Sequence, residues 1–424
     1  MSRRKQSTMK YVSFLTVALF LTVLTKQGNA YDVNGDGQEG LAESIHALQT
    51  VAGMLPFTSR IMYVGPVGTA LENGNALLNT LTSITDASSS KPYLIKLEPG
   101  IYDLGTQGLQ MLEYVDLEGS GERTTTITST HSGSDLSLSA TLYGANYSEL
   151  RFLTIENKGS GANSIAIYNE NASPDITKVT IKASGGTTTY GIYNSYSFSK
   201  LTHLSIKVTG GADNYGIYNV HSPTVITNTD ITASGGFNSH GMYEGNDSGS
   251  TISDFKMVIS GAYGSYGMNT YSNRNPDHSL TINNLTLSST ASAIAYGMRH
   301  DGCTSIDLNN SVVKAFGGST KNTGVYVNSS CVLEMNGTKI LIGGTNDDGE
   351  QPNGTGFDNG VSTVIMKNSS ISALSGSPRI QAIWSGSGEV KIISTLLEGY
   401  LHGDLTCVGA YDQAFVARNA NCSN

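Results

Sequence analysis

The chain has 424 residues, of which only 14% are charged and 49 are glycine, and its formal net charge at pH 7 is −9. Few charges combined with abundant glycine are typical of β-rich, turn-rich proteins rather than of helical ones. Acidic residues outnumber basic ones and no basic stripe is found in the sequence, which argues against nucleic acid as a partner.

Residues 1–30 have the layout of a secretory signal peptide. A basic segment precedes an apolar run at Tyr11–Thr25 and small residues that end at Ala30, where we expect cleavage. The alternative is an uncleaved membrane anchor, although the run is short for the ~20 residues of a spanning helix. Cleavage would remove five basic residues and no acidic one, taking the net charge from −9 to −14. We therefore expect a secreted or cell-surface protein without a membrane span.

Residues 31–55 begin with DVNGDGQEGLAE (Asp32–Glu43), which matches the EF-hand calcium loop. The pattern predicts a Ca²⁺ site with a short helix after it. Its expected ligands are Asp32, Asn34, Asp36, the Gln38 carbonyl and Glu43. Position eight holds Glu39 instead of an apolar residue, and no second loop of this kind occurs. An Asp/Gly-rich linker therefore remains the alternative, and a full dockerin module is doubtful.

Residues 61–400 are expected to form the main domain. NGNALLNTLTSIT (Asn73–Thr85) has apolar residues at helical spacing, and we interpret it as an amphipathic helix that caps the N-terminal end of this domain. Two strand-like segments follow, PYLIKLEPGIYDLG (Pro92–Gly105) and YVDLEGSGERTTTI (Tyr114–Ile127).

A repeat of 25 residues occupies the centre of the chain. YGIYN at Tyr190–Asn194 returns at Tyr215–Asn219, with IAIYN one interval before and HGMYE one interval after. A second strand repeats at the same interval, as KVTIKASGG (Lys178–Gly186) and HLSIKVTGG (His203–Gly211). Several short strands in each unit of about 25 residues favour a parallel β-helix, in which stacked coils bury one continuous core.

The two opening strands and the repeats resemble the pectin lyase-like superfamily. The carrying motifs are xLxPGxY and VxLxGSGxxTTI, and the resemblance covers about residues 61–400. It implies an all-β fold, a single-stranded right-handed parallel β-helix with about 25 residues per coil. It specifies activity only weakly, because the superfamily includes lyases, hydrolases, esterases and non-catalytic adhesins.

Strand alternation assigns a face to each residue of YGIYN. Ile192 is expected in the core with Tyr190 and Asn194 on its side, whereas Gly191 and Tyr193 are expected to face outward. Asn194 would stack with its counterparts one coil before and after, forming an internal amide ladder. The outward tyrosines would form an exposed stripe suited to stacking on sugars. The glycan-binding candidates are Tyr168, Tyr193, Tyr218 and Tyr243.

An insertion and the coil that follows it carry the weak candidates for catalysis. NRNPDHS (Asn273–Ser279) and RHDGC (Arg299–Cys303) would bring acids and bases to one flank, as a polysaccharide lyase requires. The candidates are Arg274, Asp277, His278, Arg299, His300 and Asp301. A polar surface turn is the alternative. Of the NTD, DD, GHG and RIK motifs shared by polygalacturonase-like hydrolases, only NTD at Asn228–Asp230 is found, which argues against that activity.

The C-terminal segment 401–424 is expected to form a separate tail. Cys407 and Cys422 bracket it and should form a disulfide in an oxidising compartment. Cys303 and Cys331 lie about one repeat apart, either bridged or merely stacked. The acidic insertion Gly343–Gly360 is either a second calcium site or a solvated turn.

Three functions remain open from the sequence. The favoured hypothesis is a secreted, calcium-binding, non-catalytic β-helix that binds glycans or surface partners. The first alternative is a polysaccharide lyase or glycoside hydrolase on the same fold. The second is a dockerin-like component of an extracellular assembly.

Overall fold

The computed structural model of the chain describes residues 60–246, 248–272, 279–302, 305–328, 332–343, 354–374, 380–412, 414 and 416–422. Several sequence-based predictions lie outside these residues. They are the signal peptide, the calcium ligands Asp32 to Glu43, the candidates Arg274, Asp277 and His278, and the cysteines Cys303 and Cys331.

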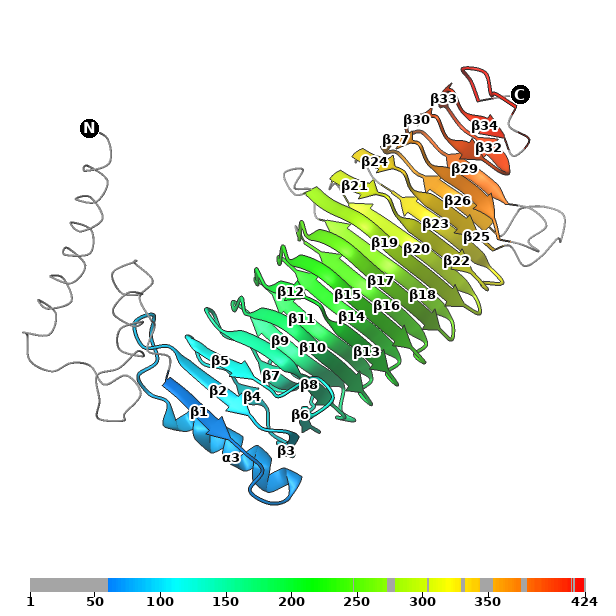
Figure 1. Ribbon diagram of the computed structural model, residues 1–424. Helices are drawn as coiled ribbons and strands as arrows, with labels where there is room; N and C mark the ends of the chain where they lie inside the picture. The colour runs from blue at the N-terminus through cyan, green and yellow to red at the C-terminus, as the bar shows by residue number, and fades with distance from the viewer. Residues whose placement is uncertain are drawn as a thin grey trace, which may run out of the picture. The chain divides into compact units, whose positions relative to one another are not determined.

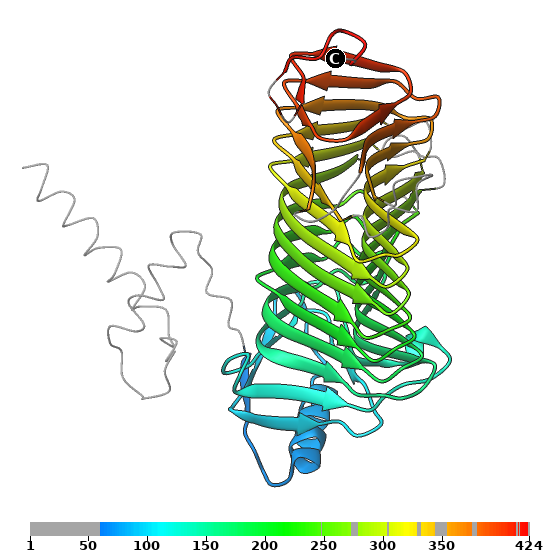
Figure 2. The same cartoon turned by 90° about the vertical axis from the view of Figure 1, so that its right-hand side faces the viewer.

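The described part of the chain is a parallel β-solenoid of about eleven turns, built from a 12-stranded and a 22-stranded sheet (Figures 1 and 2). Its strands stack in chain order along one axis. Tyr190 pairs with Tyr215 in the next coil, so the 25-residue repeat corresponds to one turn. The prediction of an all-β parallel β-helix is therefore confirmed.

Each turn gives one strand to the 12-stranded sheet and, in most turns, two strands or one long strand to the other sheet. The 12-stranded sheet comprises β4 (Leu109–Gln110), β7 (Ala140–Tyr143), β9 (Asn163–Glu170), β11 (Thr188–Ser195), β14 (Asp213–Val220), β16 (Asn238–Gly245), β18 (Gly264–Ser272), β20 (Ile294–Gly302), β23 (Lys321–Val327), β26 (Gly354–Asn359), β29 (Gln381–Ser385) and β32 (Tyr400–His402). The 22-stranded sheet comprises β1 (Arg60–Val64), β2 (Tyr93–Leu97), β3 (Gly100–Asp103), β5 (Val115–Glu118), β6 (Thr125–Ser129), β8 (Glu149–Asn157), β10 (Asp175–Ser184), β12 (Lys200–Thr202), β13 (Ser205–Thr209), β15 (Val225–Ser234), β17 (Thr251–Gly261), β19 (Ser279–Ala291), β21 (Ser305–Asn309), β22 (Val312–Phe316), β24 (Val332–Asn336), β25 (Lys339–Ile342), β27 (Thr363–Lys367), β28 (Ser370–Ala373), β30 (Val390–Ile393), β31 (Leu396–Leu397), β33 (Leu405–Val408) and β34 (Tyr411–Asp412).

The predicted capping helix is present as α3 (Ala70–Ser83), at the end of the stack opposite the C-terminus (Figure 2). It begins with a capping box, in which the Thr69 amide donates to Glu72 Oε2 at 2.6 Å and the Thr69 hydroxyl accepts from the Glu72 amide. Leu77 and Leu81 are buried, and the helix packs against β3. Within the described residues, no helix is long and apolar enough to cross a membrane.

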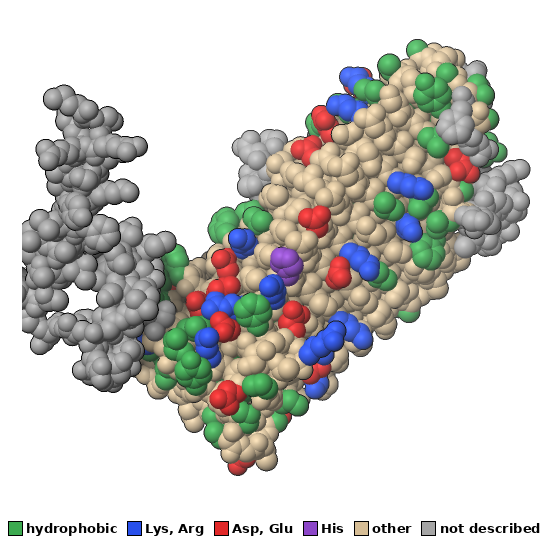
Figure 3. Space-filling view, viewed as in Figure 1, with side chains coloured by type: hydrophobic (Ala, Val, Ile, Leu, Met, Phe, Trp, Pro, Cys, Tyr) green, Lys and Arg blue, Asp and Glu red, His purple; other side chains and the backbone are tan. Residues whose placement is uncertain are grey.

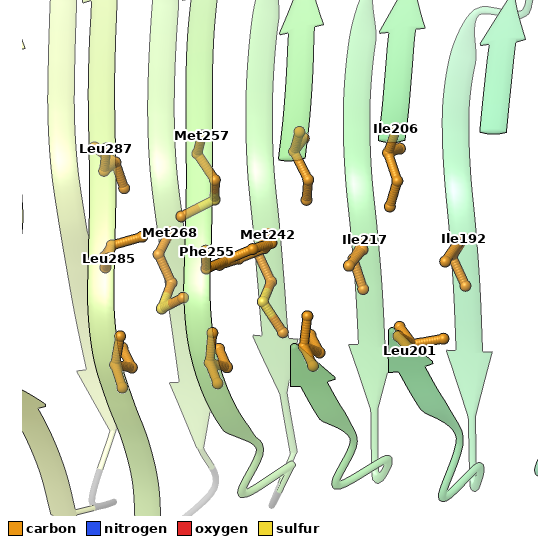
Figure 4. Packing of buried hydrophobic residues seen from close by; sticks show 14 of the residues in the cluster. Ile192, Leu201, Ile206, Ile217, Met242, Phe255, Met257, Met268, Leu285 and Leu287 are labelled. Atoms are coloured by element: carbon orange, nitrogen blue, oxygen red, sulfur yellow. The ribbon is translucent and has the colours of Figure 1, made fainter. Parts of the chain in front are cut away.

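The core is a set of aliphatic columns that run along the solenoid axis (Figure 4). Ile192 of β11 stacks on Ile217 of β14, and Met242 and Met268 continue the column; all four are fully buried. Each aliphatic side chain removed from water in this way contributes about 1.5–3 kcal/mol. Because each coil buries its core only against its neighbours, stability depends on the unbroken stack.

The glycine of YGIYN points into this core, contrary to the sequence-based prediction. A Cβ on Gly191 would lie 2.6 Å from Ile206 Cγ2 and 2.5 Å from the carbonyl oxygen of Gly216. Gly191 and Ile192 thus both face inward, and the strict alternation of the strand breaks between them. As a result, Tyr190 lies on the outer face, where we had predicted it inside.

The predicted amide ladder is present inside the solenoid. Asn169 Nδ2 donates to Asn194 Oδ1 at 2.8 Å, and Asn194 Nδ2 donates to Asn219 Oδ1 at 2.7 Å. Asn219 then donates to Glu244 Oε1 at 2.7 Å. All three amides donate in the same direction along the axis, so the ladder ends on a carboxyl group.

The solenoid continues past residue 400, where we had placed the start of a separate tail. β33 pairs with β30, and β34 pairs with β31, so both are ordinary rungs of the 22-stranded sheet. The predicted disulfide between Cys407 and Cys422 is present and joins β33 to the segment after β34. The tail therefore belongs to the last coil.

Candidate functional site

Two stacked aromatic columns cover the outer face of the 12-stranded sheet. In the first column, Tyr190, Tyr215, His240, Tyr266 and Tyr296 come from five successive strands, and neighbouring ring centroids lie 4.5 to 5.6 Å apart. In the second column, Tyr168, Tyr193, Tyr218 and Tyr243 stack at 4.5 to 5.2 Å. Rings of one column meet those of the other edge to face, as between Tyr190 and Tyr193 at 5.4 Å. The repeated YGxY motif therefore builds a continuous aromatic surface.

The four glycan-binding candidates stack on one another, so ring faces within the stripe are covered by neighbouring rings and ring edges and hydroxyl groups remain. Tyr168 is only 7% exposed and the other three are half-buried, so the stripe faces outward as predicted but is less exposed than expected. Burial raises the pKa of these phenols, that of Tyr243 to about 12. At neutral pH the stripe thus offers neutral hydroxyl donors.

His240 takes the place of a tyrosine in the first column. It is 8% exposed, between Tyr215 and Tyr266. Burial, and then the positive charge of Arg299, lower the pKa of His240 to about 3. Its Nδ1 atom finds no hydrogen-bond partner among the described residues. His240 is therefore a neutral ring whose charging this surface opposes.

A charged cluster lies where the aromatic columns end, on β20, β23 and β26. It comprises Arg299, Asp301, Lys321, Tyr326 and Asp358. Arg299 Nε donates to Asp301 Oδ2 at 2.7 Å, and Lys321 Nζ donates to Asp358 Oδ2 at 3.0 Å. The two cations lie 5.2 to 5.9 Å from the ring centre of Tyr326. Two ion pairs therefore frame one tyrosine ring, a contact that cation–π attraction favours.

Two members of the charged cluster, Tyr326 and Lys321, have raised pKa values. Burial, followed by the negative charges of Asp301 and Asp358, raises the pKa of Tyr326. Burial of Lys321 opposes its charge, but Tyr296 and Asp358 outweigh that effect and raise its pKa. Thr323, which pairs with Tyr296 across the strands, is fully buried, and its hydroxyl oxygen has no partner among the described residues.

Strand register places the aromatic stripe and the charged cluster in one row. From Tyr168 the row runs through Tyr193, Tyr218, Tyr243, Asn269, Arg299, Tyr326, Asp358, Trp384 and His402, one residue per coil. Trp384 is 37% exposed and stacks on His402. The outer face thus presents aromatic rings, amides and paired charges along a single line.

Of the predicted catalytic candidates that the structure describes, Arg299 and Asp301 lie together on the outer face. His300 does not join them, because strand alternation turns its side chain into the solenoid. There it is 2% exposed, and its Nδ1 is hydrogen-bonded to the Thr270 hydroxyl. The predicted cluster of all three residues on one flank is therefore wrong for His300.

Sequence reasoning missed Lys321, Tyr326 and Trp384, and it assigned Asp358 to the acidic insertion Gly343–Gly360 rather than to this cluster. A signal was present, because TGVYV and TGFDN occupy the same place in their coils as YGIYN. Carrying that alignment through would have placed Tyr326 and Asp358 in the row of Tyr193. The irregular coil lengths beyond residue 270 hide this correspondence.

Elsewhere on the solenoid, the largest group of ion pairs in the described residues is a network in which Arg151 contacts Asp116, Glu118 and Glu149, and Lys96 contacts Glu118. On the face drawn in Figure 3, acidic and basic groups alternate in small patches over a mostly uncharged polar surface. No group of three or more His, Cys, Asp or Glu residues suited to a metal ion occurs in the described part of the chain.

No protein-family model matches the chain, and no curated protein matches its sequence. Among solved structures, it is similar to the A-module of the mannuronan C-5 epimerase AlgE6 of Azotobacter vinelandii, with a TM-score of 0.53, 13% identity, and coverage of 80% of this chain and 95% of that chain. The AlgE4 A-module of the same organism gives a TM-score of 0.51, 16% identity and coverage of 83% and 97%. DFA-IIIase of Arthrobacter chlorophenolicus A6 in complex with GF2 gives a TM-score of 0.50 and 14% identity, with coverage of 86% of this chain and 98% of that chain. At these identities the likeness establishes the β-helix fold alone.

Proposed function

We propose that the outer face of the 12-stranded sheet binds a neutral polysaccharide chain, with the charged cluster at the centre of the binding surface. The observation that carries this proposal is the single row from Tyr168 to His402, in which aromatic and planar polar side chains follow one another coil by coil. Tyrosine and tryptophan combine apolar rings with polar tips, which suits ligands that have both C–H faces and hydroxyl groups. The mannuronan epimerases named above share this fold.

The charges of the cluster favour a neutral ligand. Arg299 and Lys321 are each paired with a carboxylate, so the cluster has no net charge to attract a polyuronate. Paired side chains still have unused donors and acceptors, and these can bind sugar hydroxyl groups. The excess of acidic residues in the chain also opposes an acidic polysaccharide.

Binding can be tested on a glycan array and by titration with the glycans that give a signal. Replacing Tyr326 and Trp384 together with alanine should lower affinity at least tenfold, because these two aromatic rings flank Asp358 in the charged part of the row. Tyr63→Ala is the matched control, since Tyr63 is 69% exposed on β1 of the other sheet. Equal affinity of the double variant and the control would exclude this face.

A polysaccharide-degrading enzyme is the second candidate, favoured by the position of Asp301 and Asp358 beside Tyr326. Two carboxylates near one sugar-binding ring are the groups that a glycoside hydrolase uses. Against it, each carboxylate is already engaged in an ion pair, Asp301 with Arg299 and Asp358 with Lys321. The discriminating measurement is turnover: reducing or unsaturated products that disappear in Asp301→Asn or Asp358→Asn would establish the enzyme.

We also propose that Asp32–Glu43 binds one calcium ion, on the strength of the loop pattern alone. The expected signal peptide before it supports a role outside the cell. Titration calorimetry of the mature chain should detect a weak site, with a dissociation constant on the order of 10⁻⁴ M. The Asp36→Ala variant should lose this heat signal. If the variant binds calcium as the parent does, the loop is only a linker.

A further inference from the structure

A cavity lies on the 22-stranded sheet, several coils before the charged cluster. Its volume is about 510 Å³, and it is lined by Ser120, Gly121, Glu122, Arg123, Thr124, Thr180 and Ser205. The first five residues form the loop between β5 and β6. Thr180 and Ser205 are paired neighbours on β10 and β13 and face outward. The cavity is therefore formed by one loop folded over the outer face of the 22-stranded sheet.

Hydrogen bonds to neighbouring strands hold this loop in place. The Gly121 amide donates to the Phe152 carbonyl at 2.8 Å, and the Ser120 hydroxyl donates to the Leu97 carbonyl at 2.8 Å. The Thr154 hydroxyl donates to the Glu122 carbonyl at 2.6 Å. Gly121 has φ +143°, a conformation that favours glycine. The cavity is thus preformed, which lowers the entropic cost of binding.

The charged groups of the loop are placed to bind a ligand. Glu122 Oε2 accepts a hydrogen bond from the Thr180 hydroxyl at 2.7 Å, which fixes the carboxylate over the sheet. No hydrogen bond or ion pair links the exposed guanidinium of Arg123 to another described residue. An oriented carboxylate and an available guanidinium therefore lie side by side in the cavity wall.

The lining defines the chemical class of the ligand. All seven lining residues are polar or glycine, so no aliphatic or aromatic side chain lines the cavity. Glu122 opposes a free anion and Arg123 opposes a cation, because each would meet a like charge. A molecule rich in neutral hydroxyl groups can donate to Glu122 and accept from Arg123 at the same time. The volume lies in the range of small-molecule sites and suits one or two sugar units.

We propose that this cavity is a second binding site for a neutral saccharide, separate from the face of the 12-stranded sheet. Glu122 accepts hydrogen bonds from sugar hydroxyls, Arg123 donates to sugar oxygens, and Ser205 adds a hydroxyl partner at the floor. The site stands independently of the first, since the two share no residue and no sheet.

The test uses the full chain and neutral tetrasaccharides of glucose and xylose, with affinity measured by saturation-transfer NMR. The measurement is made in the Tyr326→Ala, Trp384→Ala background, in which binding to the first face is expected to be weakened at least tenfold. Adding Arg123→Ala should lower the remaining affinity about tenfold, equivalent to ~1.4 kcal/mol. Lys339→Ala, an exposed cation on the outer row of the same sheet, is the matched control and should change nothing.

Each outcome separates the two proposals. Residual binding that is lost with Arg123→Ala but not with Lys339→Ala supports the second site. Absence of any residual binding overturns it and leaves the first face standing. If the Tyr326→Ala, Trp384→Ala variant binds the saccharide as tightly as the parent, and Arg123→Ala abolishes that binding, the first proposal is overturned instead. Binding of inorganic sulfate at this cavity, without any saccharide binding, would identify an anion site and contradict the saccharide assignment.

Discussion

His240 and Glu244 lie on the same strand, β16, and face opposite sides of it. His240 is part of the outer aromatic column, whereas Glu244 ends the inner amide ladder. Glu244 is 3% exposed; its Oε1 also accepts from Ser250, and its Oε2 has no partner among the described residues. Burial raises the pKa of Glu244 to about 8, although the hydrogen bonds from Ser250 and Asn219 act in the opposite direction. Glu244 is thus mostly neutral at pH 7.

These two residues should make the free energy of unfolding greatest and nearly constant over an intermediate pH range, and lower on both sides of it. The folded state retains the Glu244 proton up to about pH 8, whereas the unfolded state loses it near 4.5, so stability falls as pH rises through this window. The folded state resists protonation of His240 down to about pH 3, whereas the unfolded state accepts a proton near 6.5, so stability falls as pH drops through that window. Where the windows overlap, from 4.5 to 6.5, the two effects cancel.

We expect Glu244→Gln to remove the alkaline limb of this curve. The amide can accept the same hydrogen bonds without titrating, so the variant should gain about 1.4 kcal/mol relative to the parent for each pH unit between 6.5 and 8. His240→Tyr, which copies the neighbouring rungs, should flatten the acid limb alone. Urea titrations at several pH values provide the measurement. Parallel curves for parent and Glu244→Gln would show that the carboxyl is ionised in the folded state.

At the scale of the element, a column of glycines sets the side-chain directions in the central strands of the 12-stranded sheet. Gly191, Gly216, Gly241, Gly267 and Gly297 occupy equivalent places in successive coils, and a Cβ on each would lie 2.5 Å from the next glycine's carbonyl oxygen. The missing side chain lets both residues of a pair such as Gly216 and Ile217 face the core. It also sets two tyrosines, three positions apart, on the outer face.

Gly216→Ala should therefore be costly. The added methyl would lie 2.5 Å from Ile231 Cγ2 as well as from a carbonyl oxygen, and neither can move without disturbing the next coil. Overpacking of this kind costs about 1–3 kcal/mol. Gly245→Ala is the control, because its closest contacts are atoms of the Tyr243 ring, which lies on the outer face. Thermal or urea melts that rank Gly245→Ala as the more damaging change would reverse this assignment.

At the scale of the whole molecule, each coil of the solenoid contacts only its neighbours, so local unfolding should begin at an end of the stack. The N-terminal end is covered by α3, and the last coil is closed by the disulfide between Cys407 and Cys422. Because each coil contacts only its neighbours, opening of the last coil does not require the central coils to open.

Cys407→Ser with Cys422→Ser should loosen the last coil selectively. A disulfide that closes a loop of this size contributes about 3 kcal/mol. Hydrogen exchange should therefore accelerate in β33 and β34 while β10 to β17 keep the protection of the parent. Uniform acceleration along the chain would mean that the solenoid unfolds as a single cooperative unit.

The sequence by itself determined the architecture, because each 25-residue repeat of the sequence forms one turn of the solenoid. Equal spacing of YGIYN and of the alternating strand after it requires stacked coils, and the amide ladder follows from one asparagine per coil. The pairing of Cys407 with Cys422 followed from their positions and from the expectation of an oxidising compartment. The helix before the coils followed from its apolar spacing, within a few residues of Ala70–Ser83.

Only the tertiary structure decided which residues meet on the outer face. The inward turn of Gly191 depends on the distance to Ile206 from the opposite sheet, and no local pattern encodes that distance. The charged cluster joins residues from coils of unequal length, so Arg299, Tyr326 and Asp358 become neighbours through strand register and not through a constant interval. The cavity at Arg123 likewise needs Thr180 and Ser205, which two neighbouring coils bring together. A sequence repeat fixes how coils stack, whereas side chains from different coils form a site only once the register between those coils is set.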